Sequence, residues 1–257
     1  MTTYLDRIVE RHRELTADDT RTVATLVAEA ASMPATRGFR RALAESGGLA
    51  VIAEIKRRSP SKGDLNAALD PADLARAYER GGASCLSVLT DQEFFGGSPS
   101  DLRTARAACS LPVLRKDFTV SVLDVADARL MGADCVLLIA AALEPGELAE
   151  LHGLAIESGL DVLVEVHDEA ELDVALAAGA TLIGVNQRDL TTFEVDHQRA
   201  LRMAGVIPAD VVKVAESGIR GGEDAHALRD AGYDAILVGE TLVTSGDPAR
   251  TIGELLT

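Results

Sequence analysis

From residue 50 onward, short apolar runs return about every 25 residues along the chain, and this recurrence limits the possible folds more than any other feature. Most of the runs are rich in Val, Ile and Leu and are flanked by Gly or Asp, which is typical of strands buried on both faces of a parallel sheet. We predict strands over Val51–Ile55, Cys85–Leu89, Pro112–Leu114, Cys135–Ile139, Val162–Val166, Leu182–Val185, Val211–Ala215 and Ala235–Val238.

Longer amphipathic stretches separate these runs and predict helices. The stretch after Asp70 has Pro at its first helical position and stops at a pair of glycines, a common beginning and end for a helix. The phrases GGAS, MGAD, AGAT and AGYD recur where a helix would turn into the next strand. The predicted helices are Pro71–Arg80, Glu144–Ser158, Glu169–Ala178 and Gly222–Ala231.

Eight strand–helix units predict an α/β protein with a closed (β/α)8 TIM barrel. An open, doubly wound sheet would need a glycine-rich GxGxxG turn after its first strand, and the sequence has none there. Residues 1–48 are helical in pattern but too few to build a core of their own, so we expect an N-terminal helical extension that caps the barrel. We therefore predict a single barrel domain over residues 1–257.

Charge and hydropathy exclude several classes of function. The formal net charge of −16 repels nucleic acid and anionic membranes, so we expect neither as a partner, and an anionic substrate would need a locally basic pocket. The longest apolar run, Cys135–Leu143, is far shorter than the roughly 20 residues that span a bilayer. No signal-peptide pattern fits Met1–Leu15, so we expect a cytoplasmic protein. We also expect a monomer or a weak homo-oligomer.

The cysteines and histidines show no spacing typical of metal ligands. The three cysteines, Cys85, Cys109 and Cys135, are far apart, and two of them fall within predicted strands, which favours buried thiols in a reducing compartment. The five histidines form no HxH or HExxH arrangement. We therefore expect no metal site.

Polar residues stand where the apolar runs end, and in a parallel barrel these C-terminal strand ends meet at one face. An isolated buried charge is costly, so these groups must be paired or solvated in a pocket. Close charges of opposite sign suit acid–base chemistry, but they also suit a structural salt-bridge network, and the residues alone favour neither. The strand-end residues include Glu54, Lys56, Lys116, Glu165, Asn186, Arg188, Glu216 and Ser217.

Glycines after the last two predicted strands indicate an anion site. Ser217, Gly218 and Gly239 stand where barrels often bind phosphate, and glycine lets backbone N–H groups approach the anion. The loop after the first strand adds Ser59 and Lys62 as a hydroxyl and a cation. Aromatic residues at the same face favour an apolar slot for a planar ring. Those in strand-end loops are Phe94, Phe95 and Phe118.

Together these segments resemble the indole-3-glycerol phosphate synthase family. The combination of EIKRRSPS, LRKDF, VEVH and NQRDL is highly specific, and the resemblance covers essentially the whole chain in family order. Gln187 stands where the family often has Asn or another small residue, and Glu240 stands where some members have Ser. The matching stretches are IAEIKRRSPSKG (52–63), SVLTDQEFFGGSPSDL (87–102), PVLRKDF (112–118), LVEVH (163–167), IGVNQRDLTTFEVD (183–196), AESGI (215–219) and ILVGETLV (236–243).

The resemblance implies a reaction and a role for each matching residue. It implies that 1-(2-carboxyphenylamino)-1-deoxyribulose 5-phosphate is cyclised, decarboxylated and dehydrated to indole-3-glycerol phosphate, a step of tryptophan biosynthesis that needs no metal or organic cofactor. Lys116 resembles the general acid of ring closure, Lys56 the lysine that contacts the substrate carboxylate and assists proton transfer, and Glu165 the acid/base for the leaving hydroxyl. The other implied roles are supporting polar groups at Glu54, Asn186, Arg188 and Ser217, a phosphate cradle at Ser59, Gly218 and Gly239, and slot walls at Phe118, Leu137 and Leu190.

Two other interpretations remain open at this point. A phosphoribosyl isomerase is the nearest rival among phosphate-binding barrels, but such enzymes typically use carboxylate or cysteine acid–base pairs rather than two strand-end lysines. A non-catalytic binding barrel would have lost the reaction, although Lys56, Lys116 and Glu165 are all present. Because the chain contains no Trp, formation of a fluorescent indole would separate these interpretations.

Overall fold

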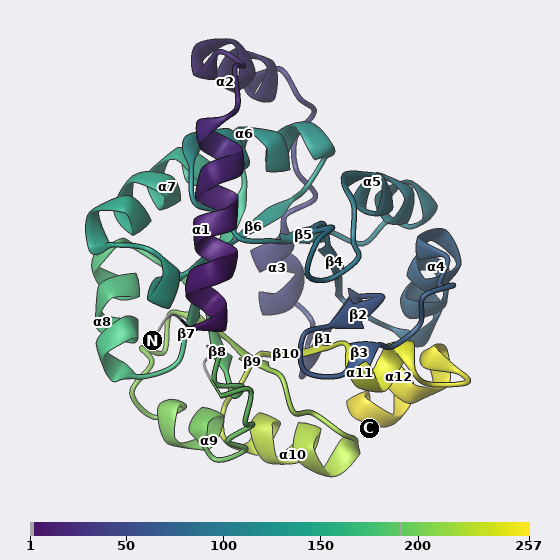
Figure 1. The fold of residues 1–257 in the computed structure, drawn as a ribbon. Coiled ribbons are helices and arrows are strands. Elements are labelled where there is room, and N and C mark those ends of the chain that lie inside the picture. The colour runs from purple at the N-terminus through teal and green to yellow at the C-terminus, as the bar shows by residue number, and fades with distance from the viewer. Residues whose placement is uncertain (1–2, 191) are drawn as a thin grey trace.

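The computed structural model describes residues 3–190 and 192–257. Over these ranges, eight parallel strands close a barrel in the order β1-β10-β9-β8-β7-β6-β5-β4, and helices surround it (Figure 1). The predicted (β/α)8 barrel is therefore confirmed. The barrel strands are β1 (Ala50–Ile55), β4 (Cys85–Leu89), β5 (Val113–Lys116), β6 (Cys135–Ile139), β7 (Asp161–Val166), β8 (Leu182–Asn186), β9 (Val212–Glu216) and β10 (Ala235–Val238), and a hairpin of β2 (Arg58–Ser59) and β3 (Gly63–Asp64) follows β1.

Several helices begin at a residue whose side chain caps the first turn. The side chain of Asp70 accepts a hydrogen bond from the backbone N–H of Asp73 at the start of α4, and Gly82 ends that helix with a φ of 91°. The helices are α1 (Tyr4–Ala17), α2 (Val23–Ala31), α3 (Phe39–Ala44), α4 (Pro71–Gly81), α5 (Pro99–Ala108), α6 (Val122–Met131), η1 (Ala140–Ala142), α7 (Pro145–Glu157), α8 (Glu169–Ala177), α9 (Arg199–Met203), α10 (Gly222–Asp230), α11 (Glu240–Val243) and α12 (Pro248–Leu256).

The predicted strands agree with the observed strands to within two residues, and the differences are informative. Strand β5 continues through Arg115 and Lys116, because these residues still pair with Val88 and Leu89 of β4. Strands β8 and β9 likewise run one residue further than predicted, to Asn186 and Glu216. The polar residues at these ends therefore lie on the strands themselves, and the sheet fixes the direction of their side chains.

Alternation along the strands divides the apolar side chains between two cores. On β1, Val51 and Ala53 pack against the surrounding helices, whereas Ala50 and Ile52 face the barrel interior. The interior is a filled core, as in other barrels of this type. It consists of Ala50, Ile52, Cys85, Leu114, Cys135, Leu137, Ile139, Leu163, Leu182, Val212, Val214, Ala235 and Leu237, together with Phe39 and Leu43 of α3.

The N-terminal extension covers both ends of the barrel. Phe39 and Leu43 of α3 are fully buried and pack against the interior core. Helix α1 crosses the opposite mouth, where Leu5 and Ile8 line a cavity (Figure 1). Helix α2 packs through its apolar face on α6. On these contacts we propose that residues 1–48 and the barrel form one domain.

The cysteines are free thiols, and Cys85 and Cys135 are buried within strands as predicted. Burial raises the pKa of both thiols well above the usual range, so they stay protonated and unreactive. None of the described helices is both long and apolar enough to cross a membrane.

Candidate active site

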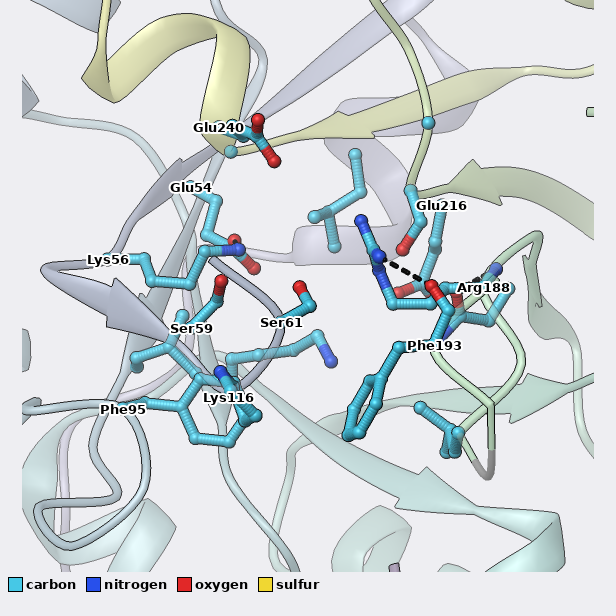
Figure 2. Close-up of a pocket in the computed structure, with 18 of the residues that line it drawn as sticks. Glu54, Lys56, Ser59, Ser61, Phe95, Lys116, Arg188, Phe193, Glu216 and Glu240 are labelled. Atoms are coloured by element: carbon cyan, nitrogen blue, oxygen red, sulfur yellow. Dashed lines mark hydrogen bonds and ion pairs between the residues drawn. The ribbon is translucent and has the colours of Figure 1, made fainter. Parts of the chain in front are cut away.

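A cavity of about 470 Å³ opens at the C-terminal ends of the strands, beneath helix α1. In Figure 2, Lys56, Ser59 and Phe95 lie on one side of this cavity, and Arg188 and Phe193 lie on the other. The structure brings together every residue to which the family resemblance gave a role, although not Phe94 of the predicted aromatic slot. Those residues are Glu54, Lys56, Ser59, Lys116, Phe118, Leu137, Glu165, Asn186, Arg188, Leu190, Ser217, Gly218 and Gly239.

Strand alternation explains why the polar groups meet. On β1, β5, β7 and β9 a polar residue stands two positions beyond an apolar residue of the interior core, and therefore points to the same side. These positions carry Glu54, Lys116, Glu165 and Glu216. Asn186 joins them at the end of β8, where it pairs in register with Glu216. The charged layer thus lies directly on top of the apolar interior.

Glu165 is the centre of this layer. Its carboxylate accepts hydrogen bonds from Lys116 Nζ at 3.3 Å and from Asn186 Nδ2 at 3.0 Å, and it lies 3.8 Å from His167 Nε2. Burial alone would raise the pKa of Glu165, but Lys116, His167 and the Asn186 hydrogen bond together hold that pKa below its usual range. Glu165 is therefore an ionised carboxylate that is only 1% exposed.

Lys116 is the cation that faces this carboxylate. Burial lowers the pKa of Lys116, but the carboxylates of Glu165, Glu216 and Glu54 raise it by more, so the pKa lies above its usual range. Lys116 is therefore held as an ammonium group with a proton to donate. Lys116 is the last residue of β5, and its side chain lines the cavity.

Lys56 makes a second charge pair on the opposite side, where its Nζ donates to Glu54 Oε1. The side chain of Lys56 is 16% exposed and that of Glu54 is 5% exposed. A Cβ at Gly239 would overlap Glu54 Oε1 and lie 3.1 Å from Lys56 Nζ. Gly239, which the sequence suggested for phosphate binding, therefore also leaves the space that this ion pair fills.

Glu216 is a site residue to which the sequence analysis gave no role. It is 2% exposed, and within the described part of the chain its Oε1 atom has no hydrogen-bond donor. Burial and the neighbouring Glu165 carboxylate raise the pKa of Glu216 well above its usual range. Burial and Glu165 thus favour the protonated carboxylic acid form of Glu216. The alternation that identified Glu165 was also the signal that could have identified it.

One side of the cavity is suited to an anion. Ser217 and Gly218 both have positive φ values, 68° and 74°, so the chain turns sharply just after β9. The side-chain amide of Gln187 donates to the carbonyl oxygen of Ser217 at 2.8 Å and so supports this turn. Hydroxyl, cationic and backbone groups also line the cavity. They come from Ser59, Ser61, Lys62, Gly218, Arg220, Gly239 and Thr241.

Another side of the cavity is apolar. The rings of Phe95 and Phe118 lie with their centroids 6.1 Å apart, and Leu137 and Leu190 add aliphatic walls. Phe94, which the sequence grouped with the slot aromatics, does not line the cavity. It packs edge-on against Tyr4 instead, at 5.9 Å.

Helix α1 and the loop after β8 supply lining residues that the sequence analysis missed. Tyr4, Leu5 and Ile8 of α1 cover the mouth, and the ring of Phe193 packs edge-on against Tyr4 at 5.1 Å. Arg188 fixes this loop, since its Nη1 donates to the carbonyl oxygen of Phe193 at 2.9 Å (Figure 2). The amphipathic pattern of α1 predicted a helix but carried no signal for its place over the cavity.

Among the described residues, His12, Asp91 and Asp117 form the one group with metal-ligand spacing. Their atoms already have partners: Asp91 accepts from two backbone N–H groups and from His12, and Asp117 accepts from Thr90, Arg115 and the backbone N–H of Phe118. The Arg115 guanidinium beside Asp117 also repels a cation. This group is therefore a salt-bridge network that joins α1 to the loops after β4 and β5.

Comparisons with known proteins agree with this architecture. A profile of the family described as indole-3-glycerol phosphate synthase matches residues 5–255. A curated protein of Streptomyces coelicolor named indole-3-glycerol phosphate synthase 2 is 55% identical over 236 residues, which cover 92% of this chain and 91% of that protein.

Solved structures with low sequence identity share the fold alone. Thiamine phosphate pyrophosphorylase from Pyrococcus furiosus has a TM-score of 0.59 at 17% identity, and covers 80% of this chain and 93% of its own. N-acetylmannosamine-6-phosphate 2-epimerase from Clostridium perfringens has a TM-score of 0.60 at 14% identity, with 76% and 87% covered. The profile and the curated relative carry the conclusion: this chain belongs to the indole-3-glycerol phosphate synthase family.

Proposed function

We propose that this chain converts 1-(2-carboxyphenylamino)-1-deoxyribulose 5-phosphate to indole-3-glycerol phosphate, carbon dioxide and water in tryptophan biosynthesis. One observation carries the proposal beyond family membership: Lys116, Glu165 and the Lys56–Glu54 pair converge in a single cavity. The lining of that cavity includes apolar residues for an aromatic ring and polar residues for a phosphate. The two lysines argue against the rival isomerase, which typically uses carboxylate or cysteine acid–base pairs.

Ring closure requires a proton donor. The electron-rich carbon of the substrate ring attacks the ketone carbon, the new C–C bond forms, and the ketone oxygen takes up a proton. Lys116 is our candidate for the donor, because its raised pKa keeps it protonated in the free protein. Decarboxylation then needs no base, since the electrons of the carboxylate bond return to the positively charged ring system.

Dehydration requires an acid for the leaving hydroxyl and a base for the remaining proton on the ring. Glu165 is our candidate acid/base: an ionised carboxylate first accepts a proton and then returns it to the hydroxyl that leaves as water. Each such transfer contributes about 10²–10⁴-fold to a rate. We assign Lys56 to the substrate carboxylate and to assistance of proton transfer, with Glu54 and Asn186 orienting the charged groups.

The remaining lining residues fit substrate binding. We propose that Ser59, Gly218 and Gly239 hold the phosphate, and that Arg188 and Ser217 contact polar groups of the substrate. The slot walls Phe118, Leu137 and Leu190 would hold the aromatic ring against apolar surface. Lys62 and Arg220 add cations to the cavity lining, where Lys62 pairs with Glu240 and Arg220 with Asp224.

Indole fluorescence tests the proposal directly, because the chain contains no Trp. Purified protein mixed with the substrate should give rising indole fluorescence. Lys116→Ala should lower turnover by at least about 10²-fold while the circular dichroism spectrum stays that of the wild type. Wild-type protein that gives no signal at micromolar concentration would sink the synthase proposal and favour a binding barrel.

A matched control is available on β9. Lys213 is also a strand lysine, but its Nζ donates to the carbonyl oxygen of Ala204 outside the cavity, at 3.0 Å. Lys213→Ala should therefore keep wild-type turnover. An equal loss in both variants would mean that lysine removal acts through the stability of the barrel and not through the chemistry.

The cellular setting follows from the same proposal. We infer a cytoplasmic enzyme, which the free thiols of Cys85, Cys109 and Cys135 support because they suit a reducing compartment. We also propose a monomer or weak homo-oligomer that needs neither nucleic acid nor membrane as a partner. Sedimentation of the purified protein at several concentrations would test this state.

A further inference from the structure

His167 lies just behind the charged layer and has no place in the chemistry proposed above. It follows β7 two residues after Glu165, and its side chain is 12% exposed. Its Nε2 atom is buried and, within residues 3–190 and 192–257, has no hydrogen-bond partner. The nearest acidic atom is Glu165 Oε1, at 3.8 Å. A buried polar atom without a partner beside a reacting carboxylate calls for a physical explanation.

The other ring nitrogen fixes the protonation of His167. Nδ1 lies 3.0 Å from Glu171 Oε2, and the same oxygen accepts the backbone N–H of His167 at 2.7 Å. An ionised carboxylate only accepts hydrogen bonds, so Nδ1 must carry a proton. If His167 were neutral, the lone pair on Nε2 would therefore face the negative charge of Glu165. A proton on Nε2 replaces this repulsion with attraction, and the imidazolium is favoured.

The charges around His167 act in the same direction. Burial lowers the pKa of His167, but the hydrogen bond to Glu171 and the charges of Glu165 and Glu171 raise it by more, and Arg199 of α9 offsets only part of this. The pKa therefore lies above its usual range. Glu165 in turn faces Lys116 on β5 and Glu216 on β9, whose pKa is raised well above its usual range.

Glu171 is held rigidly enough to serve as an anchor. It is the third residue of α8, and its backbone N–H donates to the Asp168 side chain that caps this helix. The helix start therefore holds the backbone of Glu171, and the backbone N–H and Nδ1 of His167 both contact its carboxylate. His167 therefore lies between two carboxylates: Glu171 contacts its Nδ1, and Glu165 lies near its Nε2.

We propose that His167 is a positioning residue for the acid/base Glu165: held as an imidazolium by Glu171, it orients the Glu165 carboxylate and keeps it ionised until it accepts a proton. This inference rests on the proposed function, because it assigns His167 to the dehydration step. His167 does not line the cavity, so it acts through Glu165 and does not touch the substrate. Its effect should therefore fall on kcat and not on KM.

The pH profile of kcat is the decisive measurement. His167→Gln removes the cation, so the acidic limb, which follows protonation of Glu165, should move to higher pH. We expect kcat at neutral pH to fall about tenfold, a part of what a positioned acid–base group supplies, with KM changed by less than about twofold. An unchanged acidic limb and kcat would overturn the inference, and so would a loss confined to KM.

His152 provides the matched control. It is also a buried histidine, but it lies on α7 away from the cavity. His152→Gln should leave the pH profile of kcat unchanged. Glu171→Gln should shift the acidic limb in the same direction as His167→Gln but by less. In the His167→Gln background it should add no further shift, because Glu171 acts through His167. Additive shifts would contradict that order.

An NMR titration of the imidazole signals tests the same arrangement without turnover. The His167 signal, identified by its response to Glu171→Gln, should titrate above the usual histidine range in the wild type and at lower pH in Glu165→Gln. If the His167 signal titrates at the same pH in Glu165→Gln as in the wild type, the inference is overturned. This holds even if His167→Gln fails to fold. If the wild type makes no indole but this coupling is present, the proposed function fails and the ion-pair arrangement stands.

Discussion

The carboxylate of Glu216 lies against the α-carbon of Gly184 on the neighbouring strand β8. A Cβ at position 184 would overlap Glu216 Oε1. It would also lie 3.1 Å from Glu216 Cδ and 3.2 Å from Leu163 Cδ1. Because glycine has no Cβ, the Glu216 side chain can pack against β8 at this position. From there Glu216 faces both Glu165 and Lys116.

Gly184→Ala should therefore damage the site more than the fold. The added methyl group must displace the end of the Glu216 side chain, because it would overlap Glu216 Oε1. We expect kcat/KM for indole formation to fall by at least about tenfold, while the melting temperature drops by only about 2–4 °C. Steady-state fluorescence and thermal unfolding of the same preparation measure the two effects.

Gly153 of α7 supplies the control for this substitution, because nothing lies within 4 Å of a Cβ built there. Gly153→Ala should keep full activity and stabilise the protein by up to about 1 kcal/mol, since alanine is the better helix former. If Gly184→Ala were equally active, the position of Glu216 would not matter for the reaction.

Gln187 marks a second close relationship, to the turn that follows β9. It is 3% exposed, and its amide holds the carbonyl oxygen of Ser217, whose φ of 68° is unusual for a residue other than glycine. Gln187→Ala should loosen the turn at Ser217 and Gly218, at a cost of about 1 kcal/mol in stability. We expect KM to rise more than kcat falls, because the turn belongs to the proposed phosphate side.

Kinetics on Gln187→Ala and on Gln198→Ala separate this effect from a general loss of stability. Gln198 is exposed, and its side chain makes no capping hydrogen bond with α9. Gln198→Ala should match the wild type in both constants. A Gln187→Ala variant with unchanged KM would show that the turn forms without this amide.

The strands and most of the charged layer follow from the sequence because a parallel barrel constrains them strongly. A strand buried on both faces must be apolar, so a charge such as Glu165 between two valines stands out, and alternation then decides that it points inward. The same logic reaches Lys116, although the run was predicted to end at Leu114. The same alternation also points Glu216 inward, but the sequence did not show that it lies beside Glu165.

The rest of the site depends on contacts that no local pattern encodes. Tyr4 and Phe193 are far apart in the sequence and meet only because α1 crosses the barrel mouth. The protonation of Glu216 depends on its closeness to Glu165. The apolar faces of α1 and α3 have similar patterns, yet Ile8 covers one end of the barrel and Phe39 fills the other. Periodicity shows that a face is buried but not what buries it.

The position of α3 leads to a test of the proposed single domain. Phe39 is fully buried in the barrel interior, so Phe39→Ala leaves a cavity and should cost about 3–5 kcal/mol. In one domain, the extension and barrel unfold together, and the melting temperature of a single transition should fall by about 10 °C or more. Leu15→Ala, at a residue 51% exposed, should change it little. Two separate transitions in calorimetry would contradict a single domain.

The salt bridges of His12 make the docking of α1 dependent on pH. Its Nε2 lies 3.2 Å from Asp91 Oδ2 and 3.7 Å from Asp117 Oδ1. Burial lowers the pKa of His12, but the hydrogen bond to Asp91 and the charges of Asp117, Asp91 and Asp124 raise it by more. The folded protein thus binds this proton more tightly than the unfolded chain, whose histidines have a pKa of about 6.5.

The sign of the effect follows from this difference. The stability that His12 contributes is fully present below the unfolded pKa, and it is lost as the pH rises through the higher folded pKa. The melting temperature of the wild type should therefore exceed that of His12→Gln most near about pH 6, and the gap should narrow toward about pH 9. His152 has a pKa that burial alone lowers, so the gap between wild type and His152→Gln should widen as the pH rises. Gaps that change in the same direction for both variants would rule out the charged contact of His12 as the cause.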